Sequence, residues 1–243
     1  MQPEKTYTLP EGRTLNIYHD ADARLEDDSF AIHIFTWHPR YQIGKHIDRP
    51  DSGLEFIGAQ VLAVQNAIKQ DTPWNALDRA FTRLSNCKTE QQFRERQAAV
   101  ARAMNTVCVI RPLYMYEHSG ATVSTKPFND RWDSGQVGFV FYLKEDSFTT
   151  GELRRWTAKK QKAALATIEA NVYMLDCYLR GDTWGYEVSD GESCWGFLGD
   201  GIIESGIFDC MTDEDQEHLI TTKQVTLSEK DLKDWKKRKK AHA

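Results

Sequence analysis

The sequence predicts an α+β fold, in which an antiparallel, meander-like sheet packs with several helices and one long helix lies between strands. Three patterns lead to this prediction. Apolar side chains recur at helical spacing within residues 52–104, whereas segments of residues 107–143 alternate as strands do. A second helical stripe covers residues 165–179, with apolar side chains three, four, three and four residues apart. Because strands and helices occupy separate stretches of the chain, α+β is favoured over α/β.

Two strands are expected before the helical region. Residues 15–18 form a short strand-like run, and residues 30–37 (FAIHIFTW) carry mostly apolar side chains on both faces. A strand that is apolar on both faces is typical of the interior of a sheet. Pro39 and Gly44 then interrupt the pattern and indicate loops.

The middle third of the chain is expected to be helical. Ser52 and Glu55 have the spacing of a capping box, and the apolar stripe that follows extends to Ile68. Residues 74–84 and 89–104 have the pattern of two further helices.

Strand patterns resume at residue 107. Strands are expected over residues 107–116, 121–125 and 136–143, joined by loops short enough for antiparallel pairing. A hairpin is expected over residues 183–198, because Asp190-Gly191 between two apolar runs is a strong turn signal. Glycine accepts the positive φ angle that such turns need.

The chain shows no internal repeat and no low-complexity linker. We therefore expect a single α+β domain over residues 1–226, with its helical segment at about 52–104, followed by a basic C-terminal helix or tail over residues 227–243. Residues 202–224 are expected to be helical in part.

The C-terminal segment is expected to be dispensable for folding. Within residues 231–243 the apolar candidates for burial are Leu232 and Trp235, which can bury little surface. Deleting this segment should then leave the melting temperature nearly unchanged.

The composition is that of an ordinary globular protein of the cytoplasm. The chain has 243 residues, a formal net charge of −5 and five cysteines, which we interpret as free thiols in a reducing compartment. No apolar run approaches the roughly 18 residues of a membrane span, and the N-terminus lacks a signal-peptide pattern. A net charge this mild argues against a protein that coats nucleic acid.

Three groups of short motifs lie along the chain. They are Ile17–Ala23 with Arg40–Gly44; Pro112–Gly120 with Ser124-Thr125, Pro127-Phe128 and Trp132–Gly138; and Tyr178–Asp182 with Gly185-Tyr186 and Ser193–Phe197. In order and spacing these motifs resemble a widespread, uncharacterised family of proteins encoded by phages, prophages and plasmids. The resemblance implies a mobile genetic element as the source and a bacterial host as the setting, and it implies no particular activity.

One pair of motifs is a candidate for catalysis. If the strands that flank them pair, His118 and Asp133 lie near each other, with Ser134 beside them, as nucleophilic chemistry requires. Ser and Asp before Gly are also favoured turn residues, so a structural turn explains the same motifs. The chain has no G-x-S-x-G motif, and Cys194 within a predicted strand is interpreted as a buried thiol. We therefore lean against an enzyme.

Two charged segments are candidate binding surfaces. The acidic one holds Asp20, Asp22, Glu26, Asp27 and Asp28, and the basic one holds Lys236, Lys237, Arg238 and Lys239. The acidic segment would suit a Lys/Arg-rich groove on a host complex, and the basic one could contact nucleic acid. No cofactor and no metal site are expected, because the acidic segment lacks the Gly and the terminal Glu of an EF-hand loop.

Together these observations predict a phage or mobile-element accessory protein that binds host machinery stoichiometrically. The expected partner is a host protein or ribonucleoprotein complex, and the most concrete version is a counter-defence inhibitor, either anti-CRISPR or anti-restriction. Two alternatives stay open: a small hydrolase or nucleic-acid-modifying enzyme that uses His118 and Asp133, and a nucleic-acid-binding accessory protein.

Overall fold

The chain divides into two compact units, each of which combines strands with helices. The computed structural model describes residues 2–25, 29–41, 43–49, 58, 61, 79–80, 82–83, 86, 88–144 and 156–242. Met1–Leu25 and Met174–Ala243 form one unit, here called the terminal unit, and Glu26–Tyr173 form the central unit. The predicted α+β class is confirmed. The predicted capping box at Ser52, and most of the two helices expected between residues 52 and 84, lie outside the described residues.

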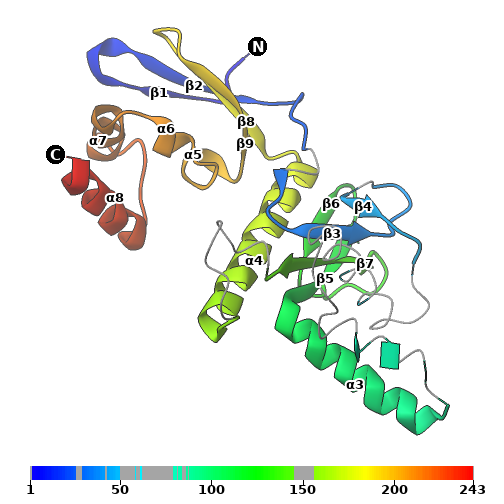
Figure 1. The fold of residues 1–243 in the computed structure, drawn as a ribbon. Coiled ribbons are helices and arrows are strands. Elements are labelled where there is room, and N and C mark those ends of the chain that lie inside the picture. The colour runs from blue at the N-terminus through cyan, green and yellow to red at the C-terminus, as the bar shows by residue number, and fades with distance from the viewer. Residues whose placement is uncertain are drawn as a thin grey trace. The chain divides into compact units, whose positions relative to one another are not determined.

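The terminal unit contains a four-stranded antiparallel sheet of order β1-β2-β8-β9 (Figure 1). Its strands are β1 (Lys5–Thr8), β2 (Thr14–His19), β8 (Thr183–Val188) and β9 (Ser193–Leu198), and the 3₁₀ helix η1 (Pro10–Gly12) joins the first two. β8 and β9 form the predicted hairpin, with Gly191 at a φ of 105° in its turn. Because β2 and β8 come from opposite sides of the central unit in the chain, their pairing closes the terminal unit.

Helices cover one side of this sheet (Figure 1). They are α5 (Gly201–Glu204), α6 (Ile207–Cys210), α7 (Asp213–Thr221) and α8 (Glu229–His242). The apolar core that they share with the sheet includes Leu15, Ile207, Leu219 and Trp235. Trp235 on α8 is 8% exposed, and its indole N–H donates to Gln216 Oε1 at 2.7 Å. The expectation that the C-terminal segment buries little surface is therefore wrong for Trp235.

In the described part of the central unit, a five-stranded sheet has the order β4-β3-β7-β5-β6 (Figure 1). Its strands are β3 (His33–Thr36), β4 (Lys45–His46), β5 (Cys108–Glu117), β6 (Ala121–Ser124) and β7 (Ser134–Leu143). β3 lies between β4 and β7, as its apolar faces predicted. β3 and β4 are parallel, and the other pairs are antiparallel. The order differs from a simple meander because the two ten-residue strands, β5 and β7, pair with each other and leave short β6 at the edge.

A predicted helix packs against this sheet. α3 (Glu90–Val107) follows Thr89, whose hydroxyl oxygen accepts a hydrogen bond from the Gln92 N–H at 3.2 Å, as an N-cap does. The core between α3 and the sheet includes Val100, Met104, Phe139, Phe141 and Leu143.

The long helix predicted between strands is α4 (Ala158–Arg180), which begins in the central unit and ends in the terminal unit. Its stripe is buried at Ile168, Val172 and Leu175. Within the central unit, Asn171 Oδ1 on α4 accepts a hydrogen bond from the Ala31 N–H at 2.9 Å. Across the described residues, we find no helix whose length and apolar character would suit it to cross a membrane.

The four described cysteines are in no disulfide, which agrees with the sequence interpretation of reduced thiols. Cys108 and Cys177 are buried, whereas Cys194 and Cys210 are exposed. The expectation that Cys194 is buried is wrong, because its strand β9 lies at the edge of the sheet and four of its residues are exposed.

We predict that a reducing agent leaves the stability of the protein unchanged, because none of the four described cysteines is in a disulfide. Thermal melts with and without dithiothreitol should give the same melting temperature within about 1 °C. A drop of several degrees in dithiothreitol would show that a disulfide stabilises the fold.

Candidate functional site

The predicted catalytic residues gather at one end of the five-stranded sheet. His118 follows β5, Asp133 precedes β7, and these strands pair with Tyr116 opposite Ser134. His118 Nδ1 lies 3.1 Å from Asp133 Oδ2, and the two side chains are 68% and 43% exposed. The prediction that the two motifs meet at one end of a sheet is confirmed.

The loop before β7 is held in one conformation by Asp130. The carboxylate of Asp130 accepts hydrogen bonds from the Asp133 N–H at 2.8 Å and from the Trp132 N–H at 2.7 Å. These bonds favour the ionised carboxylate and lower the pKa of Asp130. The loop leaves Trp132 94% exposed, although a Trp side chain is usually well buried.

A hollow of about 420 Å³ opens beside this loop. Within its lining, the guanidinium of Arg40 lies 2.5 Å from Glu117 Oε2, and His38 Nε2 lies 3.6 Å from the same oxygen. The backbone N–H groups of Arg40 and Tyr41 both donate to His38 Nδ1 at 3.3 Å. A neutral ring that accepts at Nδ1 carries its proton on Nε2, which here faces the carboxylate.

Sequence reasoning missed Glu117 and His38. Glu117 is 77 residues from Arg40 in the chain, so no local spacing indicates their contact. The available signal is that Arg40 and Glu117 both belong to the motif segments quoted above. A charged residue within each of two such segments is a candidate pair.

The hydroxyl groups of Ser119 and Ser134, near His118, donate their hydrogen bonds to backbone carbonyl oxygens and not to the imidazole ring. The Ser134 hydroxyl donates to the carbonyl oxygen of Asp130, and the Ser119 hydroxyl donates to the carbonyl oxygen of His118 itself at 2.7 Å. Ser119 has a φ of 54°, which fits the tight turn between β5 and β6. The His118–Asp133 pair is therefore present without either of these hydroxyls aligned to it as a nucleophile.

Within the described part of the acidic segment, Asp20 is held by backbone hydrogen bonds of its own unit. Asp20 Oδ2 accepts a hydrogen bond from the Gly196 N–H at 3.0 Å, and Asp20 Oδ1 accepts one from the Asp22 N–H at 3.2 Å. Asp20 therefore ties the loop after β2 to β9, while Asp22 is exposed. Glu26, Asp27 and Asp28 lie outside the described residues.

The basic segment divides into two pairs of residues. Arg238 lies 2.9 Å from Asp209, and Lys239 forms an ion pair with Glu217. Lys236 and Lys237 are exposed. Of the four predicted contact residues, the first two in the chain therefore face solvent, and the last two bind α8 to its own unit.

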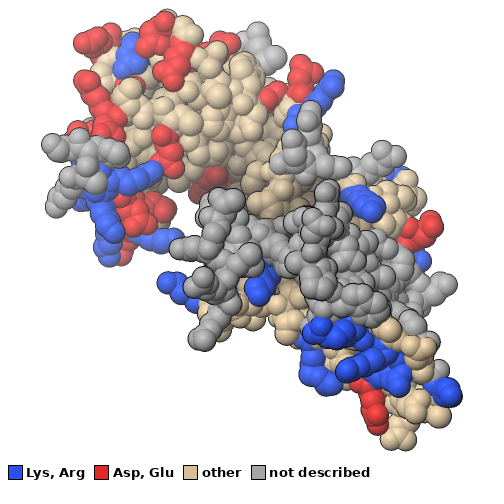
Figure 2. All heavy atoms as spheres, in the orientation of Figure 1, with Lys and Arg blue, Asp and Glu red and all other residues tan. Residues whose placement is uncertain are grey.

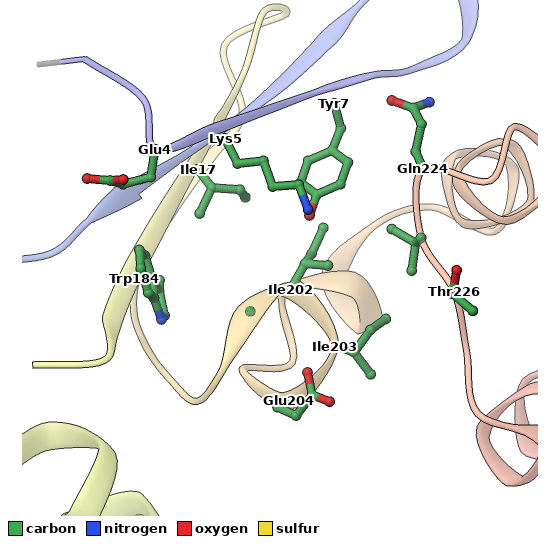
Figure 3. A pocket seen from close by; sticks show the side chains of 12 residues that line it. Glu4, Lys5, Tyr7, Ile17, Trp184, Ile202, Ile203, Glu204, Gln224 and Thr226 are labelled. Carbon is green, nitrogen blue, oxygen red and sulfur yellow. The ribbon is translucent and has the colours of Figure 1, made fainter. Parts of the chain in front are cut away.

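A second hollow, of about 340 Å³, lies in the terminal unit between the sheet and α5 (Figure 3). It is lined by apolar side chains that include Ile17, Trp184 and Ile202. Its polar groups are partly engaged, since the Trp184 N–H donates to a backbone carbonyl at 2.8 Å and the Gln224 amide bonds both backbone groups of Thr8. None of the residues that the sequence predicted for a site lines this hollow.

Among the described residues, we find no cluster of three or more His, Cys, Asp or Glu side chains that could hold a metal ion. Compared with known protein families, curated proteins and solved structures, the chain matches none of them. The candidate site therefore has to be interpreted from its own geometry.

Proposed function

We propose that the chain is an accessory protein of a phage or another mobile element that acts by stoichiometric binding to a host protein or ribonucleoprotein complex in the bacterial cytoplasm. The proposed contact is the Trp132 surface, which we define as Trp132 with Arg40, Glu117, His118 and Asp133. The observation that carries the proposal is the 94% exposure of Trp132 on a hydrogen-bonded loop. Counter-defence, as an anti-CRISPR or anti-restriction inhibitor, is its most concrete form.

The chemistry of the Trp132 surface supports a binding role. A few residues carry most of the binding energy at protein interfaces, and Trp, Tyr and Arg are enriched among them. Arg40, whose side chain is 71% exposed, adds a planar charged group to the same surface. Because Asp130 orders the loop before any partner arrives, association would cost little conformational entropy.

The 3.1 Å contact between His118 and Asp133 favours a second candidate, a hydrolase or nucleic-acid-modifying enzyme. In this alternative, Asp133 would orient the imidazole ring and His118 would act as a general base. The direction of the Ser134 hydroxyl towards Asp130, and the 68% exposure of His118, support binding over catalysis.

We predict that Trp132→Ala weakens capture of the partner at least about thirtyfold, the loss expected for an interface hot spot of about 2 kcal/mol. The tagged full-length protein, incubated with a lysate of the bacterial host with and without nuclease, provides the capture assay. Trp195→Ala is the control, because Trp195 is a 41%-exposed indole in the terminal unit. Equal capture by wild type and Trp132→Ala would exclude the Trp132 surface as the contact.

Stoichiometry separates binding from catalysis. With the captured partner in hand, its inhibition should saturate near one equivalent of the protein. His118→Ala and Asp133→Ala should retain inhibition within about tenfold, because exposed charged contacts contribute about 1 kcal/mol or less. Full inhibition at a hundredth of an equivalent, abolished by either substitution in a folded protein, would establish the enzyme instead.

A further inference from the structure

We infer that α8 docks the terminal unit on the phosphate backbone of a nucleic-acid duplex through Lys230, Lys233, Lys236 and Lys237. The helix (EKDLKDWKKRKKAH) carries seven Lys and Arg residues against three Asp and Glu. This surface is separate from the Trp132 surface, and the inference does not rest on the function proposed above.

One face of α8 is exposed to solvent, and the other face packs against the rest of the terminal unit. On the inner face, Trp235 is buried in the core of the terminal unit, and its N–H donates to Gln216. Arg238 and Lys239 form ion pairs with acidic residues of α6 and α7. A helix fixed in this way presents the backbone positions of its remaining lysines in a set orientation, so a ligand has to order only their side chains.

The exposed lysines have the charge density that a duplex requires. Lys230, Lys233, Lys236 and Lys237 are all exposed, as are Glu229 and Asp234 on the same helix, so the lysines outnumber the exposed carboxylates two to one over this stretch. From the first to the last of them the helix rises about 10 Å, at about 1.5 Å per residue. A duplex carries about one phosphate per 1.7 Å of its axis when both strands are counted, and about one per 3.4 Å along each strand. Over about 10 Å, a duplex therefore offers about six phosphates, whereas one of its strands offers about three to four, so a duplex has more phosphates available to the four lysines.

The same helix is poorly suited to an anionic membrane. Helices that lie in a membrane surface insert an exposed apolar face between the lipids. From Glu229 to Arg238, every exposed residue of α8 is charged, while Leu232 and Trp235 pack against the core. The phosphate backbone of a nucleic acid therefore suits α8 better than a lipid surface does.

The surroundings of α8 restrict the contact to this helix. Figure 2 shows Lys and Arg side chains gathered over α8 with some Asp and Glu side chains among them, whereas Asp and Glu side chains predominate over the rest of the terminal unit in this view. Acidic residues repel phosphate, so the duplex would meet the terminal unit at α8. The mild negative net charge of the whole chain, −5, is thus compatible with a local contact to nucleic acid.

The test is the salt dependence of binding to a fluorescent 30-base-pair DNA duplex. If four lysines each neutralise one phosphate, log K should fall against log salt with a slope of about −3.6. Between 50 and 200 mM salt, this slope weakens binding about a hundredfold. The variant K230Q/K233Q/K236Q/K237Q should lose nearly all of the slope while its melting temperature stays that of the wild type, since Trp235 and both ion pairs are kept.

A matched control removes the same charge elsewhere. In K88Q/K126Q/K159Q/K162Q, four exposed lysines of the central unit are replaced, and the affinity for the duplex should stay within about twofold of the wild type. The inference is overturned if the wild type does not bind the duplex at 50 mM salt, or if the α8 variant binds it as the wild type does. Equal losses in both variants, or stronger binding to the single strand or to vesicles with anionic lipids, would overturn it as well.

Discussion

Replacing Trp235 with alanine is expected to destabilise the terminal unit by about 3–5 kcal/mol, the range for a buried aromatic residue. The substitution removes an indole that is 8% exposed and leaves Gln216, itself 6% exposed, without the N–H that donates to its side chain. Both effects have the same sign, because an empty cavity and an unpaired buried acceptor each penalise the folded state. Urea denaturation followed by circular dichroism measures the loss.

Two further variants assign the cause. Trp235→Phe keeps most of the apolar contact and removes the hydrogen bond, so it should cost about 1–2 kcal/mol. Trp132→Ala, which alters an indole that is 94% exposed, should leave stability unchanged within about 0.5 kcal/mol. Deletion of residues 231–243 should destabilise the unit at least as much as Trp235→Ala. A truncated protein that melts like the full chain would contradict the packing of α8.

The sequence predicted the elements whose signal is local. The apolar stripe of α4 and the alternation of Val137, Phe139 and Phe141 in β7 each repeat within a few residues, so the pattern reports the burial directly. The hairpin at Asp190-Gly191 is local in the same sense, because the turn itself brings the two strands together.

Long-range contacts explain what the sequence did not reveal. Trp235 stands among lysines in the sequence, and its burial depends on the distant core residues of the terminal unit and on Gln216, 19 residues earlier. The sequence places Asp20 in an acidic run that is expected to face solvent. Its carboxylate instead accepts a hydrogen bond from the N–H of Gly196, 176 residues away. The pairing of β2 with β8 and the division into two units have no local signal, since a segment inserted between two strands leaves each strand's own pattern unchanged.

The same distinction between local and long-range contacts applies to the candidate site, of which one pair of residues could be predicted from the sequence and the other contacts could not. His118 and Asp133 flank two strands whose antiparallel pairing follows from their pattern, so their proximity could be inferred. The contacts of Glu117 with Arg40 and His38 depend on the pairing of β3 with β7. The periodicity of apolar residues predicts that a strand forms but does not predict which strand it pairs with.

The second large loss of stability is expected from a substitution between β3 and β7. Gly138 pairs with Thr36 in the register of these strands. A Cβ added at Gly138 would lie 2.2 Å from the carbonyl oxygen of Phe35 and 3.1 Å from the Cα of Thr36. Because backbone atoms cannot rotate away as a side chain can, β3 must shift to admit even a methyl group. We expect Gly138→Ala to destabilise the central unit by about 3 kcal/mol, the upper part of the usual range for overpacking.

Gly135→Ala is the matched control on the same strand, because a Cβ at Gly135 meets no atom within 4 Å. It should change the free energy of unfolding by less than about 1 kcal/mol, as urea denaturation would measure.

Gly138→Ala should also weaken partner capture, since a shift of β3 moves His38 and Arg40, which follow it, away from Glu117. Normal stability in Gly138→Ala would show that β3 does not pack on β7 as described. Lost stability with full partner capture would instead show that Arg40 and Glu117 need not be held together for binding, and the Trp132 surface would then reduce to the loop from Asp130 to Asp133 with His118.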